Sequence, residues 1–70
     1  MLNIQIGKRY RNIKTQNIYT VINIGLASWD SDQCLIVYQQ AEGRDSTIWI
    51  RSRTEFNEKF EEVKNEISIG

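Results

Sequence analysis

One segment of this sequence alternates aromatic, aliphatic and basic side chains. In Thr47-Ile48-Trp49-Ile50-Arg51, the tryptophan and the arginine are two residues apart, so in an extended strand both side chains stand on one face. An indole ring stacks on a planar ring, and a guanidinium group donates a fork of hydrogen bonds to phosphate. The pair therefore indicates a site for a planar, anionic ligand such as a nucleotide.

Two further segments supply candidates for the same site. A basic stretch opens the chain, and a tyrosine ends an apolar run near its middle. The expected ligand-binding set is Arg11, Lys14, Tyr38, Trp49 and Arg51. If Ile48 and Ile50 are core residues, Trp49 and Arg51 stand together on the outside. The competing interpretation is that the aromatic rings fill the core, with arginine stems laid over them.

Trp29 stands apart from this set. Its neighbours Ser28, Asp30 and Asp32 are typical of a loop, so we expect an exposed side chain that contacts a protein partner. An SH3-like protein-interaction module, with Trp29, Trp49 and Tyr38 in an aromatic groove, is therefore the alternative to a ligand-binding module.

The missing residue types limit the chemistry. The 70 residues include no histidine and one cysteine, so one chain is not expected to form a histidine-based triad, a zinc cluster or a disulfide framework. Cys34 adjoins an apolar run and is interpreted as a small core residue. Asp30, Asp32 and Asp45 are interpreted as turn formers, because the glycine and glutamate of a calcium loop are missing. We expect no metal, no cofactor and no enzymatic activity; catalysis by a carboxylate is a third hypothesis.

The charges of the chain cancel overall but not locally. Nine Lys and Arg residues balance nine Asp and Glu residues, which argues against coating nucleic acid by bulk positive charge. Residues 1–20 carry four basic and no acidic residues, whereas residues 54–70 carry two basic and five acidic residues. A local basic site is therefore compatible with a neutral chain.

Length indicates one small domain over residues 1–70, with a core at about 5–64 and a frayed tail at 65–70. No run approaches the ~20 apolar residues of a membrane span, and the first residues lack the features of a signal peptide. We expect a cytoplasmic protein, monomeric or a small homo-oligomer. Ile67 and Ile69 are candidates for a dimer contact.

Alternation and β-branched residues predict strands over residues 7–13, 18–26, 35–39 and 47–51, separated by polar loops that include 28–33. Gly25 is expected to mark a bulge or a sharp bend. After residue 51 the spacing becomes helical: Ser52 and Glu55 fit a capping box, and Phe56 and Phe60 share a helical face. Either a helix runs to residue 66, or a helical turn ends near 59 and a strand follows at 60–64; we favour the second.

Strands this close together pair antiparallel, because no connection is long enough for a crossover helix. The predicted fold class is mainly β: a small SH3-like, strongly bent antiparallel barrel of four or five strands with a short helical turn near the C-terminus. An open sheet with the C-terminal helix across it is the rival architecture.

The sequence also resembles a known family. Tyr10-Arg11, Leu35-Ile36-Val37-Tyr38 and Trp49-Ile50-Arg51 follow the order and nearly the spacing of the motifs Y-R-H-x-K-G, V-V-Y and W-V-R-P. These motifs are typical of DUF1653, a small bacterial domain of unknown function, and the likeness covers about residues 7–63. Asn12 stands in place of the histidine and Ser52 in place of the proline. The positions that match are Tyr10, Arg11, Lys14, Tyr38, Trp49 and Arg51. The resemblance implies a small β-barrel and brings no established activity.

The leading hypothesis is a non-enzymatic binding module for a nucleotide-like small molecule or a short stretch of nucleic acid. In a phage, such a module would sequester a nucleotide signal of host immunity.

Overall fold

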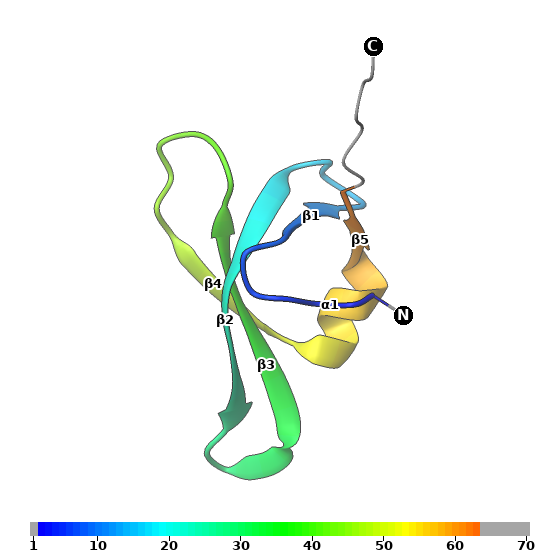
Figure 1. The fold of residues 1–70 in the computed structure, drawn as a ribbon, viewed down its shortest axis with the longest axis vertical. Coiled ribbons are helices and arrows are strands. Elements are labelled where there is room, and N and C mark those ends of the chain that lie inside the picture. Colours follow the sequence, from blue (N-terminus) through cyan, green and yellow to red (C-terminus); the bar gives the residue numbers. More distant parts are fainter. Residues whose placement is uncertain (1, 64–70) are drawn as a thin grey trace.

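Five antiparallel strands form one sheet in the order β4-β3-β2-β1-β5. The computed structural model describes residues 2–63. Its elements are β1 (Arg9–Asn12), β2 (Ile18–Ala27), β3 (Asp30–Gln40), β4 (Ile48–Ser52), α1 (Arg53–Lys59) and β5 (Phe60–Glu62). The long β2–β3 hairpin extends away from the end of the molecule that carries α1 and β5 (Figure 1). The mainly β fold with a short C-terminal helix is confirmed.

The edges of the sheet are β4 and β5, and α1 connects them along the chain. Among residues 2–63, no ladder pairs β4 with β5, so closure into a barrel stays a prediction. The core lies between the curved sheet and α1, with the N-terminal segment passing in front of the helix in the view of Figure 1.

The favoured continuation after residue 51 is confirmed. The Ser52 hydroxyl accepts a hydrogen bond from the backbone N–H of Glu55 at 3.2 Å, which satisfies a free donor at the start of α1. The helix ends at Lys59, and the backbone of Phe60 is already extended, with φ −123° and ψ 158°. The expected tail at 65–70 lies outside the described residues.

The predicted loop over residues 28–33 is wrong, because β3 already begins at Asp30 and the turn consists of Ser28 and Trp29. A hairpin end that projects into water keeps polar residues in a strand without a burial penalty. The prediction for Gly25 is also wrong. Gly25 pairs regularly with Leu35, whereas the irregularities lie between Val21 and Asn23 and between Leu26 and Ala27.

The core is largely aromatic. Its buried members are Tyr10, Val21, Ile36, Tyr38, Phe56 and Phe60. Phe56 and Phe60 stack with ring centroids 4.1 Å apart, and Tyr38 meets each of them edge-on at 5.3 Å. The Tyr10 hydroxyl donates to the carbonyl of Asn3 at 2.8 Å and accepts from the N–H of Gln5 at 2.9 Å. Cys34 packs against this cluster, in line with its structural interpretation.

The face of β4 that lies toward the core is the opposite of the one expected from the sequence. Trp49 lies opposite Tyr38 and Arg51 opposite Ile36, both buried core residues. Ile48 and Ile50 therefore point away from the core and are 50% and 62% exposed. The alternation of side chains along the strand was predicted correctly. The prediction that the two isoleucines are core residues was wrong, because the pairing with β3 decides which face of β4 is covered.

The basic start of the chain folds onto its acidic end. Antiparallel pairing of β1 with β5 brings the Lys8 ammonium 2.7 Å from a Glu62 carboxylate oxygen and Arg11 2.9 Å from Glu61. The hydrogen bond to Glu62 raises the pKa of Lys8 above its ordinary value. Two of the four basic residues near the start of the chain are thus paired with acidic residues near its end.

Candidate anion-binding pocket

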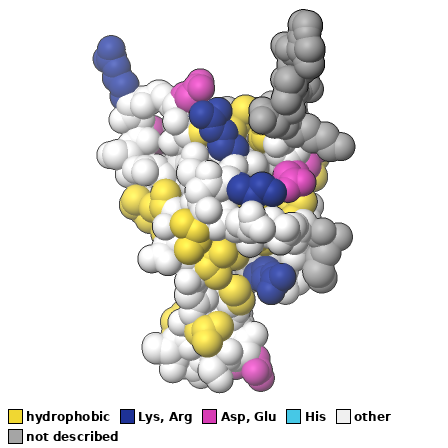
Figure 2. Space-filling view, viewed as in Figure 1, with side chains coloured by type: hydrophobic (Ala, Val, Ile, Leu, Met, Phe, Trp, Pro, Cys, Tyr) yellow, Lys and Arg dark blue, Asp and Glu magenta, His cyan; other side chains and the backbone are white. Residues whose placement is uncertain are grey.

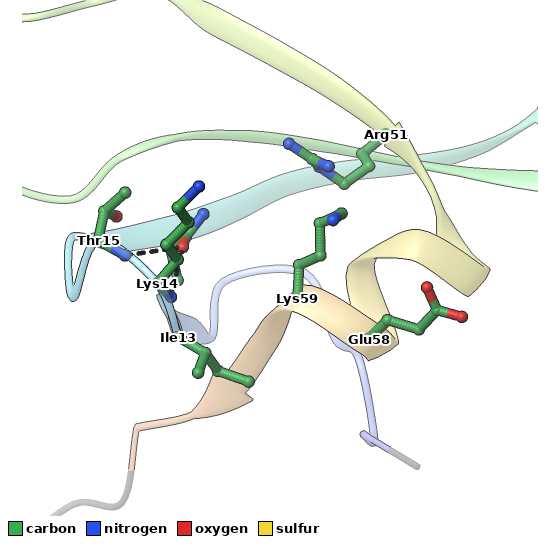
Figure 3. A pocket seen from close by; sticks show the side chains of 7 residues that line it. Ile13, Lys14, Thr15, Arg51, Glu58 and Lys59 are labelled. Atoms are coloured by element: carbon green, nitrogen blue, oxygen red, sulfur yellow. Dashed lines mark hydrogen bonds between the residues drawn. The ribbon is translucent and has the colours of Figure 1, made fainter.

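A pocket of about 410 Å³ opens where the β1–β2 turn faces the end of α1 and the inner side of β4 (Figure 3). Its lining residues are Asn12, Ile13, Lys14, Thr15, Arg51, Glu58 and Lys59. Three of these side chains are cationic and one is a carboxylate. The lining is therefore net positive, although the whole chain is neutral.

Asn12 builds the wall formed by the β1–β2 turn. Its side-chain oxygen accepts hydrogen bonds from the backbone N–H groups of Lys14, at 2.9 Å, and Thr15, at 3.1 Å. The turn closes through Gln16, whose φ of 68° is in the left-handed region and whose N–H donates to the Asn12 carbonyl at 2.7 Å. Asn12 thus shapes the backbone that carries Lys14.

The same turn is tied directly to the helix. The backbone N–H of Ile13 donates to the carbonyl of Lys59 at 2.9 Å. Two lysines that are distant in sequence are thereby held on neighbouring backbone segments.

Arg51 is held in place by three partners. Its Nε donates to the Tyr38 hydroxyl at 3.1 Å, its Nη1 lies 3.7 Å from Glu55 Oε1, and its guanidinium carbon lies 5.9 Å from the centroid of the Phe60 ring. The hydrogen bond to Tyr38 raises the pKa of Arg51 above its ordinary value. Because Tyr38 occupies one of five N–H donors, the fixed guanidinium keeps donors for a ligand.

Lys14 and Lys59 have no such partners. Within the described part of the chain, neither ammonium group makes a hydrogen bond or an ion pair. In Figure 3, both side chains reach toward the space below Arg51. Three like charges around one cavity repel one another, and a bound anion relieves that repulsion.

The two residues predicted to stack on a ligand, Tyr38 and Trp49, differ in their exposure to solvent. Tyr38 is 3% exposed, so its ring is a core residue and only its hydroxyl serves the pocket, through Arg51. Trp49 is 46% exposed and stands two residues from Arg51 on the same face of β4. It does not line the pocket but lies beside it, as an accessible aromatic surface.

Arg11 and Trp29 lie elsewhere. Arg11 is on the face of β1 opposite Tyr10, where it pairs with Glu61. Trp29 is 74% exposed at the β2–β3 turn, nine residues before Tyr38 and therefore about 30 Å away along an extended strand. Trp29, Trp49 and Tyr38 consequently do not form one aromatic groove.

Lys59 and Glu58 line the pocket but were not predicted from the sequence. Lys59 carried one usable signal, its place in the last turn of a short helix. Nothing local indicates that this turn meets the β1–β2 turn, because Ile13 and Lys59, the residues that join them, are 46 residues apart.

The family can now be compared with this geometry. The model of the family described as Protein of unknown function (DUF1653) matches residues 8–68. The chain belongs to the DUF1653 family. The resemblance noted from Tyr10-Arg11 and Trp49-Ile50-Arg51 is thereby confirmed at the level of the family. No curated protein and no solved structure is significantly similar to this DUF1653 chain.

Two further searches concern residues 2–63 of this DUF1653 protein. None of its helices there has the length and apolarity to cross a membrane. The same residues contain no group of three or more Cys, Asp or Glu side chains placed to hold a metal ion.

Proposed function

We propose that this DUF1653 protein is a non-enzymatic binding module for a nucleotide-like anion. The phosphate occupies the pocket between the turn and the helix, and the planar ring stacks on Trp49. The observation that supports this proposal is the convergence on one pocket of an anchored guanidinium and of two lysines that have no partner among residues 2–63.

The separation between ring and charge suits such a ligand. Trp49 and Arg51 stand on one face of β4, about 6.6 Å apart along the strand. A nucleotide places its phosphate and its base at the two ends of a sugar, so one molecule reaches both side chains. Stacking on an exposed indole contributes about 1–3 kcal/mol per base.

The guanidinium group and the two ammonium groups would bind the phosphate in different ways, because their geometries differ. Arg51 offers a planar fork fixed by Tyr38, which suits two phosphate oxygens at once. Lys14 and Lys59 act as flexible point charges that close over the anion from the turn and the helix. Tyr38 is a positioning residue, because it acts through Arg51.

Binding without turnover lowers the free concentration of the ligand. A phage protein of this kind would act on host immunity by holding a signalling nucleotide. A short single strand of nucleic acid offers the same phosphate and base chemistry. It differs in that its affinity falls steeply with salt, since several phosphates release counterions.

Fluorescence titration tests the proposal. Trp29→Phe leaves Trp49 as the only tryptophan, so its emission reports on the proposed site alone. We expect saturable changes with nucleoside phosphates, weaker changes with the free nucleosides, and competition by inorganic phosphate. A short oligonucleotide that binds more tightly than mononucleotides, with a steep salt dependence, would indicate nucleic acid as the ligand.

Matched charge variants locate the site. Lys14→Gln and Lys59→Gln should each weaken nucleotide binding about tenfold, the effect of one charge-assisted hydrogen bond. Arg9→Gln is the control, because Arg9 carries the same charge, is exposed and does not line the pocket. Equal losses in all three variants, or no saturable response of Trp49 to any phosphate compound, would contradict the proposal.

A further inference from the structure

β4 is an edge of the sheet with one side open. It pairs with β3 alone among the described strands, so the backbone groups on its other side are free to pair with another chain. Natural edge strands are commonly blocked by proline, by charged residues or by a bulge. β4 has no proline and no bulge, and its one charged residue, Arg51, is turned inward to Tyr38.

Both faces of this edge are apolar. Ile48, Trp49 and Ile50 are consecutive and are 50%, 46% and 62% exposed. Because neighbouring side chains on a strand point to opposite faces, a partner that covers one face leaves the other uncovered. A strand added to the edge covers both. Figure 2 shows hydrophobic side chains in a row that follows β4 and continues toward the far end of the β2–β3 hairpin.

The other edge strand, β5, is short and carries charged side chains that are already paired. β5 has three residues, and its glutamates pair with Arg11 of the neighbouring β1 and with Lys8 directly before that strand. Addition of a strand is therefore favoured at β4 and not at β5.

The sequence around β4 is complementary to itself. In an antiparallel pair with its two-fold axis at Trp49, Ile48 of one copy lies opposite Ile50 of the other, so the isoleucines of the outer faces meet. Asp45, in the loop before β4, and Arg53, the first residue of α1, then flank the paired strands at the same end, one from each copy. Both residues are exposed, and Arg53 has no ion pair within residues 2–63. Opposite charges that lie close together attract each other.

We infer that a second copy of this chain pairs antiparallel with β4, in the register centred on Trp49, to form one continuous sheet across a two-fold axis. The register centred on Ile50 is less favourable, because it places the apolar Ile48 of one copy opposite the polar Ser52 of the other. A two-fold contact uses the same patch on both subunits, as this self-complementary segment requires. The inference does not depend on the proposed ligand.

Sedimentation equilibrium of the whole chain tests the pairing. We expect a reversible dimer for the natural sequence and a monomer for Ile50→Lys at the same concentrations. Ile50 contributes little to the core because it is 62% exposed, so this variant should keep its circular dichroism spectrum. Leu26→Lys is the control: Leu26 is 65% exposed but lies at the far end of β2, so its dimer should persist.

Three outcomes would overturn the proposal. They are a natural chain that stays monomeric at millimolar concentration, an Ile50→Lys variant that dimerises as the natural chain does, and a dimer that Leu26→Lys abolishes. If Ile50→Lys does not fold, Ile50→Thr replaces it, since threonine keeps the β preference and removes apolar surface.

Disulfide trapping tests the register. In a Cys34→Ser background, chains with Ile48→Cys are mixed with chains with Ile50→Cys and oxidised. Residues directly opposite in antiparallel strands have Cβ atoms about 4.5–5.5 Å apart, close to what a disulfide needs. The mixed disulfide should form fastest; faster self-linking of Ile50→Cys would overturn the register centred on Trp49.

Discussion

The two edge strands of the sheet, β5 and β4, differ in how far their apolar side chains are buried. At the β5 edge, Phe60 is 2% exposed and stacks on Phe56 of the preceding helix, and the strand's glutamates are paired with Arg11 of β1 and with Lys8 just before it. At the β4 edge, Ile48, Trp49 and Ile50 are all about half exposed or more. The stabilising contacts are thus concentrated on the side of α1 and β5, whereas β4 carries three consecutive exposed apolar side chains.

Position relative to the helix explains the difference. α1 follows β4 directly and places Phe56 in the core beside Tyr38 and Phe60. The helix therefore covers the core-side face near Arg51, where β4 ends, and leaves the first residues of β4 uncovered. Substitutions at the β5 edge should therefore change the free energy of unfolding, whereas substitutions at the β4 edge should change binding to partners with little effect on unfolding.

The largest expected effect is at the β5 edge. Phe60→Ala should lower the free energy of unfolding by about 3–5 kcal/mol, because it removes a fully packed aromatic ring from the core. That loss is comparable to the whole stability of a small domain. Ile50→Ala at the β4 edge should change the unfolding free energy of the monomer by about 0.5 kcal/mol or less. Urea denaturation followed by circular dichroism measures both, and similar losses would refute the contrast between the edges.

Tyr38→Phe tests the hydrogen bond that links the core residue Tyr38 to Arg51 of the pocket. It keeps the ring but removes the hydroxyl that accepts from Arg51, so the unfolding free energy should fall by about 1 kcal/mol. Phosphate affinity should fall as well, because Arg51 is no longer held in place. Tyr19→Phe is the matched control: its ring lies 5.2 Å from that of Tyr38, and its hydroxyl makes no hydrogen bond within residues 2–63. Unchanged affinity in Tyr38→Phe would contradict the positioning role.

The ion pairs of the β5 edge should contribute less. A double-mutant cycle with Arg11→Gln and Glu61→Gln should give a coupling free energy of about 0.2–1 kcal/mol, since both side chains are partly exposed. Raising the salt concentration should reduce this coupling. A coupling that exceeds the effect of Phe60→Ala would mean that charge, rather than aromatic packing, holds this edge.

The smallest effect concerns the loop before β4. Hydrogen bonds from the hydroxyl and the N–H of Thr47 to Asp45 lower the pKa of that carboxyl below its ordinary 3.8. A lowered pKa means that the stabilising contribution is present above pH 3.8 and is lost as the pH falls through the folded-state value. The stability difference between the natural chain and Asp45→Asn should therefore shrink in strong acid. Urea denaturation at a series of acidic pH values measures it, and a difference that does not vary with pH would exclude this linkage.

Local signals were sufficient for most of the elements. The capping box of Ser52 and Glu55 predicted where α1 begins, and β-branched residues located β2. They failed at residues 28–33, because polar composition does not distinguish a loop from the exposed end of a long hairpin. The V-V-Y-like and W-V-R-like stretches were sufficient to recognise the family.

The candidate site was predicted only in part. Lys14 and Arg51 line the pocket, and Trp49 lies beside it. Arg11 was assigned to the same site as Lys14, yet it lies on the face of β1 opposite Tyr10 and pairs there with Glu61. Lys59 was missed, because a hydrogen bond between backbone segments far apart in the chain brings it to the pocket.

The sequence by itself determined that this is a mainly β domain with a short C-terminal helix, and that Trp49 and Arg51 share a face, because alternation and capping act over a few residues. Only the tertiary structure decided which face is buried and which cations converge. Pairing with β3 turned Arg51 toward Tyr38 and left Ile48 and Ile50 in water. Those outcomes depend on contacts between segments that the chain brings together only when it folds.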